Sequence, residues 1–160
     1  MMMRTRHGSA VISLPNDLDI VLKRDFEAPI ELVFDVLTKP EHVTRWFFDQ
    51  ELRECSIDLR VGGNYHFVAV MDDGREMGFH GTFLELERPT RFVDTWVFEG
   101  RPDDEAIEAV DLHEAGGVTT MTSTLTFRDR GGRDRMTEHG FDGLQESYDR
   151  VEDLLRTLTG

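Results

Sequence analysis

The sequence predicts an α+β fold in which a curved antiparallel β-sheet wraps around one long C-terminal α-helix. From about residue 52 onward, apolar and polar residues alternate with a period of two through segments separated by short turns, as in hairpin-linked strands. Over residues 134–158 the apolar residues instead recur every three or four positions, which is the repeat of one helix face. A long meander of strands tends to curl, and this helix is the predicted element that is long enough to cover its inner face.

The chain begins with a predicted loose arm, residues 1–16, which ends at the turn signal Pro15-Asn16. Residues 17–160 are predicted to form a single domain. Its first strand covers residues 17–26, where apolar residues alternate with charged ones and Arg24 is the one polar interruption of the apolar face.

Two short helices are expected after this strand. Ala28-Pro29 opens the first, because proline is tolerated at a helix start, where its missing N–H would have no partner. Pro40 starts a second helical turn that carries Trp46 and Phe47. Clusters of Gly, Pro, Asn and Asp then separate the remaining predicted strands, which cover residues 52–59, 65–71, 76–87, 91–99, 105–113 and 118–128.

Composition excludes several classes of protein. The net charge of −14 on 160 residues argues against nucleic acid and anionic membranes, whose phosphates would be repelled. No apolar run approaches the length of a membrane span, and the N-terminus lacks the apolar core of a secretory signal. Cys55 is the single cysteine, which excludes an internal disulfide and makes the cytoplasm the expected location. A monomer and a homodimer both remain open.

Four parts of the chain have the sequence of a known family in the same order: residues 26–47, residues 61–65, residues 81–96, and Met136 with Gly140-Phe141 and Leu144. They resemble the START-like (SRPBCC) helix-grip superfamily, and in particular the bacterial relatives of the activator of heat-shock protein 90 ATPase. The resemblance spans roughly residues 17–158, and Phe141 stands where the family commonly has Trp. It implies a helix-grip fold with an inner pocket between sheet and long helix, which many members use for an apolar or aromatic ligand.

The candidate binding residues follow from this expected pocket. On a helix-grip fold, Trp46 and Phe47 would lie near the pocket entrance. Gly140 and Gly143 stand within the predicted long helix and either allow close packing or leave room for a cavity. The other candidates are His66, His80, Asp94, Trp96, Met136, Phe141, Leu144, Ser147 and Tyr148.

No motif for catalysis, a cofactor or a metal is evident. The histidines lack a second His or Cys at zinc-like spacing, and Cys55 lacks a visible activating base. Asp94 alternates in phase with apolar neighbours, so it should point inward unless a strand bulge moves it to solvent. If the polar residues converge inside, Arg24 or His80 would pair with Asp94, with perturbed pKa values that suit an acid/base role.

Three functions are therefore weighed. The first is binding of an apolar or aromatic small molecule in a cavity of at least about 300 Å³, without catalysis. The second is a protein-interaction module, cochaperone-like or linked to stress response, with a chaperone-like partner; it needs an exposed apolar or strongly charged patch. The third is an enzyme, of cyclase or hydrolase type, which needs polar groups that converge inside the same cavity.

Overall fold

The computed structural model describes residues 10–138 and 140–159. Residues 1–9 of the expected arm, and His139, lie outside the described residues. The elements are β1 (Val11–Ser13), β2 (Asp19–Phe26), α1 (Ile30–Thr38), α2 (Pro40–Trp46), β3 (Glu54–Ile57), β4 (Asn64–Val70), β5 (Glu76–Glu87), β6 (Arg91–Phe98), β7 (Ala106–Ala115), β8 (Val118–Phe127), α3 (Arg130–Thr137) and α4 (Asp142–Thr159).

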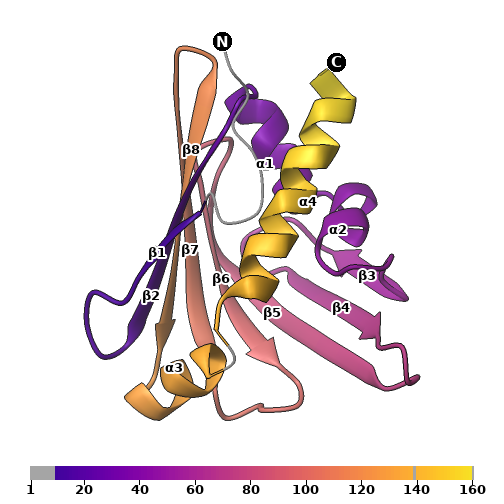
Figure 1. The fold of residues 1–160 in the computed structure, drawn as a ribbon, viewed down its shortest axis with the longest axis vertical. Coiled ribbons are helices and arrows are strands. Elements are labelled where there is room, and N and C mark those ends of the chain that lie inside the picture. The colour runs from indigo at the N-terminus through magenta and orange to yellow at the C-terminus, as the bar shows by residue number, and fades with distance from the viewer. Residues whose placement is uncertain (1–9, 139, 160) are drawn as a thin grey trace.

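The strands form one antiparallel sheet in the order β1-β2-β8-β7-β6-β5-β4-β3. From β3 to β8 each strand pairs with the next along the chain, and the two N-terminal strands add to the far side of β8. The sheet is curved, and α1, α2 and α4 lie on its concave side (Figure 1). The fold predicted from the sequence, a curved antiparallel sheet that grips a C-terminal helix, is confirmed.

Alternation along each strand places the core between the concave face and the helices. On β8, for example, Thr119, Met121, Ser123, Leu125 and Phe127 are buried, whereas the residues between them are partly exposed. The main apolar cluster joins inner positions of the sheet, Met121 among them, to α1, α2 and α4. No helix among the described residues is long and apolar enough to cross a membrane.

The expected loose arm contains a short strand. Val11–Ser13 pairs with β2 in the register Ile12↔Leu22 and adds an eighth strand at the edge of the sheet. Ala10 is also tied to α4, because its backbone N–H donates to Gln145 Oε1 at 3.2 Å and its carbonyl accepts from Gln145 Nε2 at 3.0 Å.

The single long helix predicted over residues 134–158 is wrong in one respect, because the chain forms two helices there. α3 begins with Asp129 as its N-cap, whose side chain accepts from the Gly132 N–H at 2.8 Å. Gly140 has a φ of +82°, a left-handed conformation that ends a helix and that glycine adopts without steric cost. The chain thus changes direction before α4, which packs on the concave side of the sheet together with α1 and α2 (Figure 1).

A buried charged network fixes α4 against the sheet. Arg24 on β2 donates to Asp149 Oδ1 at 2.8 Å and to Glu152 Oε1 at 3.1 Å. Arg24 is 2% exposed and Glu152 is equally buried. Removal of one member of such a pair strongly destabilises the fold, because the other member is left as an uncompensated buried charge.

Candidate functional site: an aromatic cavity with a buried acidic pair

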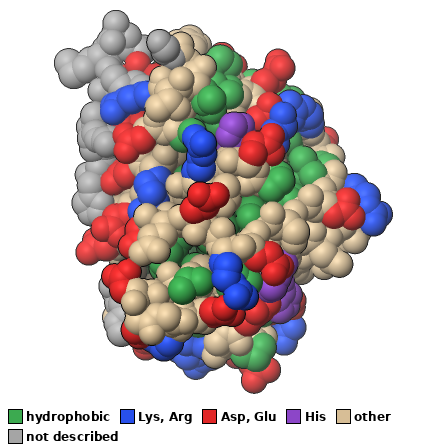
Figure 2. All heavy atoms as spheres, turned by 90° about the vertical axis from the view of Figure 1, so that its right-hand side faces the viewer, with side chains coloured by type: hydrophobic (Ala, Val, Ile, Leu, Met, Phe, Trp, Pro, Cys, Tyr) green, Lys and Arg blue, Asp and Glu red, His purple; other side chains and the backbone are tan. Residues whose placement is uncertain are grey.

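A cavity of about 540 Å³ lies between the concave face of the sheet and the helices α2 and α4. Its lining is mainly apolar, with side chains from every strand between β3 and β8. Figure 2 shows the face that carries α2, α4 and β3, where hydrophobic side chains reach the surface among both acidic and basic ones. The part of the wall discussed below consists of Trp46, Phe47, Tyr65, Phe67, Phe79, Asp94, Trp96, Phe98, Glu108, Gly143, Leu144, Ser147 and Tyr148.

The helical side of the cavity is held by contacts between α4 and the end of α2. Trp46 stacks on Tyr148 with ring centroids 5.9 Å apart and an interplanar angle of 27°. Trp46 Nε1 also donates to the Val36 carbonyl at 2.7 Å. The Ser147 hydroxyl donates to the Phe47 carbonyl at 3.1 Å, and Arg150 Nε donates to the Trp46 carbonyl at 3.0 Å. These bonds fix the backbone that carries the two aromatic residues.

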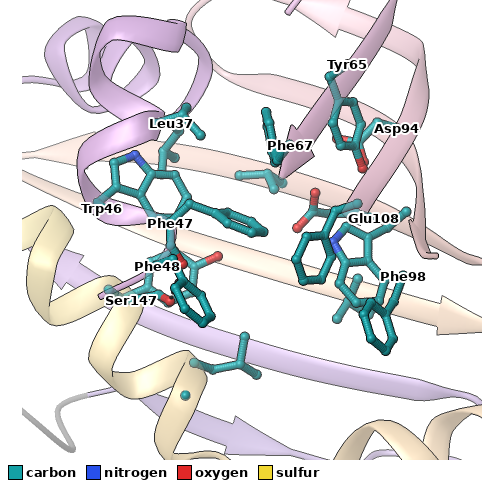
Figure 3. Close-up of a pocket in the computed structure, with 18 of the residues that line it drawn as sticks. Leu37, Trp46, Phe47, Phe48, Tyr65, Phe67, Asp94, Phe98, Glu108 and Ser147 are labelled. Carbon is teal, nitrogen blue, oxygen red and sulfur yellow. Dashed lines mark hydrogen bonds between the residues drawn. The ribbon is translucent and has the colours of Figure 1, made fainter. Parts of the chain in front are cut away.

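An aromatic wall continues from this point across the sheet (Figure 3). Phe47 contacts Phe67 and Phe79 with centroid distances of 5.0 and 5.1 Å. Phe79 in turn contacts Trp96 at 5.7 Å and Phe98 at 5.3 Å. Tilted and edge-on ring pairs at these distances are favourable beyond their area burial, so the wall is a preorganised apolar surface.

Gly143 leaves room on the opposite side. A Cβ atom added at Gly143 would meet no atom within 4 Å. Of the two roles considered for this glycine, close packing is therefore contradicted and open space is what the structure shows. Because glycine within a helix costs about 1 kcal/mol relative to alanine, the sequence carries an energetic cost at a position where nothing is packed.

The inner wall carries two carboxyl groups side by side. Asp94 on β6 and Glu108 on β7 are opposite each other in the sheet register, and a hydrogen bond joins their side chains. The strand irregularity lies on β5, between Phe83 and Glu85, and leaves Asp94 pointing inward. Asp94 is 2% exposed. Glu108 keeps part of its surface open toward the cavity.

Burial and proximity change the protonation of this acidic pair. Burial is the main cause that raises the pKa of Asp94 well above its ordinary value, and the charge of Glu108 raises it further. Burial also raises the pKa of Glu108. Two carboxyls this close cannot both ionise easily, so the pair retains a shared proton.

Two phenols flank the acidic pair. Tyr65 donates to the Thr95 carbonyl at 2.7 Å and lies 3.3 Å from Asp94 Oδ1. Its ring can approach β5 because position 81 is glycine, where a Cβ would lie 2.6 Å from the Tyr65 ring. The Ser123 hydroxyl lies near Tyr148 and opposes the rise of its pKa. Burial raises the pKa of both tyrosines, so both hydroxyls are neutral hydrogen-bonding groups.

The structure brings most of the candidate residues to this cavity. Those that line it are Trp46, Phe47, Asp94, Trp96, Met136, Gly140, Gly143, Leu144, Ser147 and Tyr148. Phe141 does not line it and instead packs with Met136 against a smaller cluster around Ile20 and Phe127.

His66 and His80 are not cavity residues. Both alternate out of phase with Tyr65, Phe67 and Phe79 and lie on the outer face of the sheet. There, His66 contacts Glu54 and Glu99, and His80 Nδ1 lies 2.7 Å from Glu99 Oε2. The inward orientation considered for the two histidines is therefore wrong, because it depended on a strand register that the structure does not have.

Neither Arg24 nor His80, the two expected partners of Asp94, contacts it. Arg24 pairs with Asp149 and Glu152 on α4 and His80 pairs with Glu99, whereas Asp94 meets Glu108 and Tyr65. Cys55 is packed near the Pro40 carbonyl, and burial raises the pKa of its thiol to about 11, which keeps it protonated. The described residues contain no group of three or more His, Cys, Asp and Glu side chains placed to hold a metal ion.

Glu108 and Tyr65 were not among the candidates, although the sequence holds a signal for each. Glu108 alternates in phase with the apolar residues Ala106, Val110 and Leu112, as Asp94 does on its own strand. Tyr65 shares its phase with Phe67. A polar group in the apolar phase of a strand is expected to face the interior. Two such groups meet only if their strands are neighbours in the sheet, and alternation does not reveal which strands are neighbours.

Comparison with known proteins assigns the chain to a family. Residues 27–156 match the family model described as "Activator of Hsp90 ATPase homolog 1-like protein". No curated protein matches the sequence. Among solved structures, a protein from Rhodobacter sphaeroides is 21% identical, with a TM-score of 0.86, covering 93% of this chain and 99% of the other.

Two further solved structures agree. A protein from Nitrosomonas europaea is 26% identical, with a TM-score of 0.80, covering 92% of this chain and 99% of its own. A protein from Chromobacterium violaceum is 24% identical, with a TM-score of 0.74, covering 89% and 98%. Because the family model matches most of this chain, the chain belongs to the family of activator of Hsp90 ATPase homolog 1-like proteins.

Proposed function

We propose that this protein binds an apolar or aromatic small molecule in the cavity between the sheet and α4. The observation that carries the proposal is the preformed cavity of about 540 Å³. Small-molecule sites commonly have volumes of about 300 to 1,000 Å³, with mainly hydrophobic and aromatic walls and a few polar groups that fix orientation. The aromatic wall supplies the first feature, and the acidic pair with its two phenols supplies the second.

The way in which the cavity is built also supports binding. Trp46, Phe47 and Tyr148 are fixed by stacking and by hydrogen bonds to backbone carbonyls, so a ligand would not have to order them. Because immobilising flexible side chains opposes association, a fixed wall favours affinity. Gly143 lines the exposed edge of the cavity, and no atom lies within 4 Å of the position that a Cβ would take there.

A titration with N-phenyl-1-naphthylamine, a neutral aromatic dye at pH 7, tests the proposal. We expect saturable fluorescence enhancement with one dye per chain. The variant Gly143→Trp should abolish it by filling the cavity, whereas Thr157→Trp, on an exposed position of the same helix, should bind as the parent does. Absence of binding, or equal binding by both variants, would contradict a ligand site in the cavity.

A second candidate function is interaction with a chaperone, favoured by the description of the family as homologous to an activator of Hsp90 ATPase. It is tested by ATP hydrolysis by a purified Hsp90 chaperone, measured with and without this protein. A rate increase that saturates with added protein would support this function, and the Gly143→Trp variant would show whether the cavity takes part.

A further inference from the structure

We propose that the ligand is an apolar or aromatic compound with a basic nitrogen, whose protonated N–H group is held by Asp94 and Glu108. This inference rests on the proposed function, because it concerns the same cavity. It goes further in naming the polar group of the ligand and the residues that recognise it.

The orientation of Glu108 is the first argument. Its carboxyl points into the cavity rather than along the sheet (Figure 3). Apart from the hydrogen bond that it shares with Asp94, no hydrogen bond or ion pair is made to it within residues 10–138 and 140–159. A buried carboxyl normally has several hydrogen-bond donors around it, so this group has an acceptor position open to a ligand.

The surroundings of the acidic pair select a cation. The three arginines that line the cavity are engaged elsewhere: Arg135 with Asp104, Arg101 with Glu138, and Arg150 with the Trp46 carbonyl. The titratable groups that face the pair are the phenols of Tyr65 on β4 and Tyr148 on α4, both neutral. Arg24 on β2 influences Tyr148 and is held by Asp149 and Glu152.

The aromatic wall adds to this preference. The rings of Phe67, Phe79 and Trp96 line the same cavity as the two carboxyls. Aromatic faces attract cations, and this attraction is strengthened where water is excluded. The same arrangement disfavours a carboxylate ligand, because two acidic groups would then be buried beside a third. The site should therefore reject fatty acids of similar size.

Binding of a basic ligand should also change the protonation of the acidic pair. The acidic pair holds a proton when no cation is present, as argued above. An ammonium group placed beside it favours the ionised form, so binding of an amine at neutral pH should release a proton to the solvent. A neutral ligand in the same cavity should release none.

The test compares three compounds of matched shape by isothermal titration calorimetry at pH 7: 1-naphthylmethylamine, 1-naphthalenemethanol and 1-naphthoic acid. The amine is expected to bind about 10- to 100-fold more tightly than the alcohol, as for a hydrogen bond to a charged group, and the acid more weakly than the alcohol. Titrations in phosphate and in Tris, which differ in ionisation heat, should show proton release with the amine alone.

Variants separate the outcomes. Glu108→Gln keeps the shape of the side chain, and we expect it to bring the amine to the affinity of the alcohol while the alcohol still binds, which also shows that the variant is folded. Glu87→Gln, an exposed glutamate on β5, removes the same charge and should keep the preference for the amine. Binding of the alcohol with no preference for the amine would overturn this inference and leave the proposed function intact. Failure of all three compounds to bind would contradict both.

Discussion

Asp94 and Glu108 face each other across the β6–β7 register and share a hydrogen bond at the wall of the cavity. Two acidic groups in contact within an otherwise aromatic interior are costly unless they have a partner or a proton. This relationship accounts for the polarity of the site, and it makes the stability of the protein depend on pH in a predictable direction.

The acidic pair should lower stability as pH rises. Its pKa values are raised in the folded protein, so the folded state keeps protons that the unfolded chain loses above about pH 4. From there up to the raised values, the free energy of unfolding should fall by up to about 1.4 kcal/mol per pH unit for each proton retained.

The double variant Asp94→Asn/Glu108→Gln lacks both carboxyl groups, so its free energy of unfolding should not show this fall with pH. Urea unfolding of parent and variant at several values between about pH 5 and pH 8 measures the difference. Two parallel curves would show that the pair ionises as freely in the folded protein as in the unfolded chain.

Arg24 is predicted to be a main support of α4. The variant Arg24→Met leaves Asp149 and Glu152 without their buried cation, and we expect the free energy of unfolding to fall by about 3–5 kcal/mol. Arg53→Met is the matched control, because Arg53 and its partner Glu76 are exposed, and it should change stability by less than about 1 kcal/mol. Equal effects of the two substitutions in urea unfolding would refute a special role for Arg24.

The two glycines before and within α4 should respond to alanine in opposite ways. Gly140 has a φ of +82°, so Gly140→Ala should destabilise the fold by about 1–2 kcal/mol. Gly143 is helical with open space at its Cβ, so Gly143→Ala should stabilise it by up to about 1 kcal/mol. Thermal unfolding of the two variants should thus shift the midpoint in opposite directions, and a shift in the same direction would contradict the break at Gly140.

The pKa of His66 is predicted to lie above that of an ordinary histidine. Its hydrogen bond to Glu54, together with the charge of Glu99, raises the pKa of His66. The associated stabilisation is present below about pH 6.5 and is lost as the pH rises through the raised value; for this exposed cluster it should be below about 1 kcal/mol. An NMR titration of the His66 ring should show the pKa fall in Glu54→Gln and stay unchanged in Glu87→Gln. No change in Glu54→Gln would contradict the contact.

The sheet could be predicted from the sequence because its signal is local. Period-two alternation bounded by turn residues located β5 over residues 76–87 and β6 to within one residue. The strand β1 was not predicted, since three residues are too few to show a period and are ordered by pairing with β2.

The break before α4 was hidden by the same kind of pattern. Met136, Gly140 and Leu144 are four residues apart, so the helical repeat continues across the position where the helix ends. Apolar spacing records which face is buried, and it does not record the backbone angle of Gly140. The conformation at Gly140 is set by tertiary packing, because the chain must turn there for α4 to pack on the sheet.

The candidate site was predicted on its apolar side and only partly on its polar side. Trp46, Phe47 and Tyr148 could be placed from the resemblance to the family and their helical positions. The partner of Asp94 could not, because the pairing of β6 with β7 is a long-range property that alternation within one strand leaves undetermined. The orientation of His66 and His80 depended on register for the same reason.

Amide NMR spectra recorded during a titration with 1-naphthalenemethanol test most directly whether the cavity is a binding site. The account predicts saturable shifts at Trp96, Phe98, Gly143 and Leu144, which line the cavity, and none at His66 and His80 on the outer face. Shifts confined to the outer face, or an unchanged spectrum at saturating compound, would contradict it.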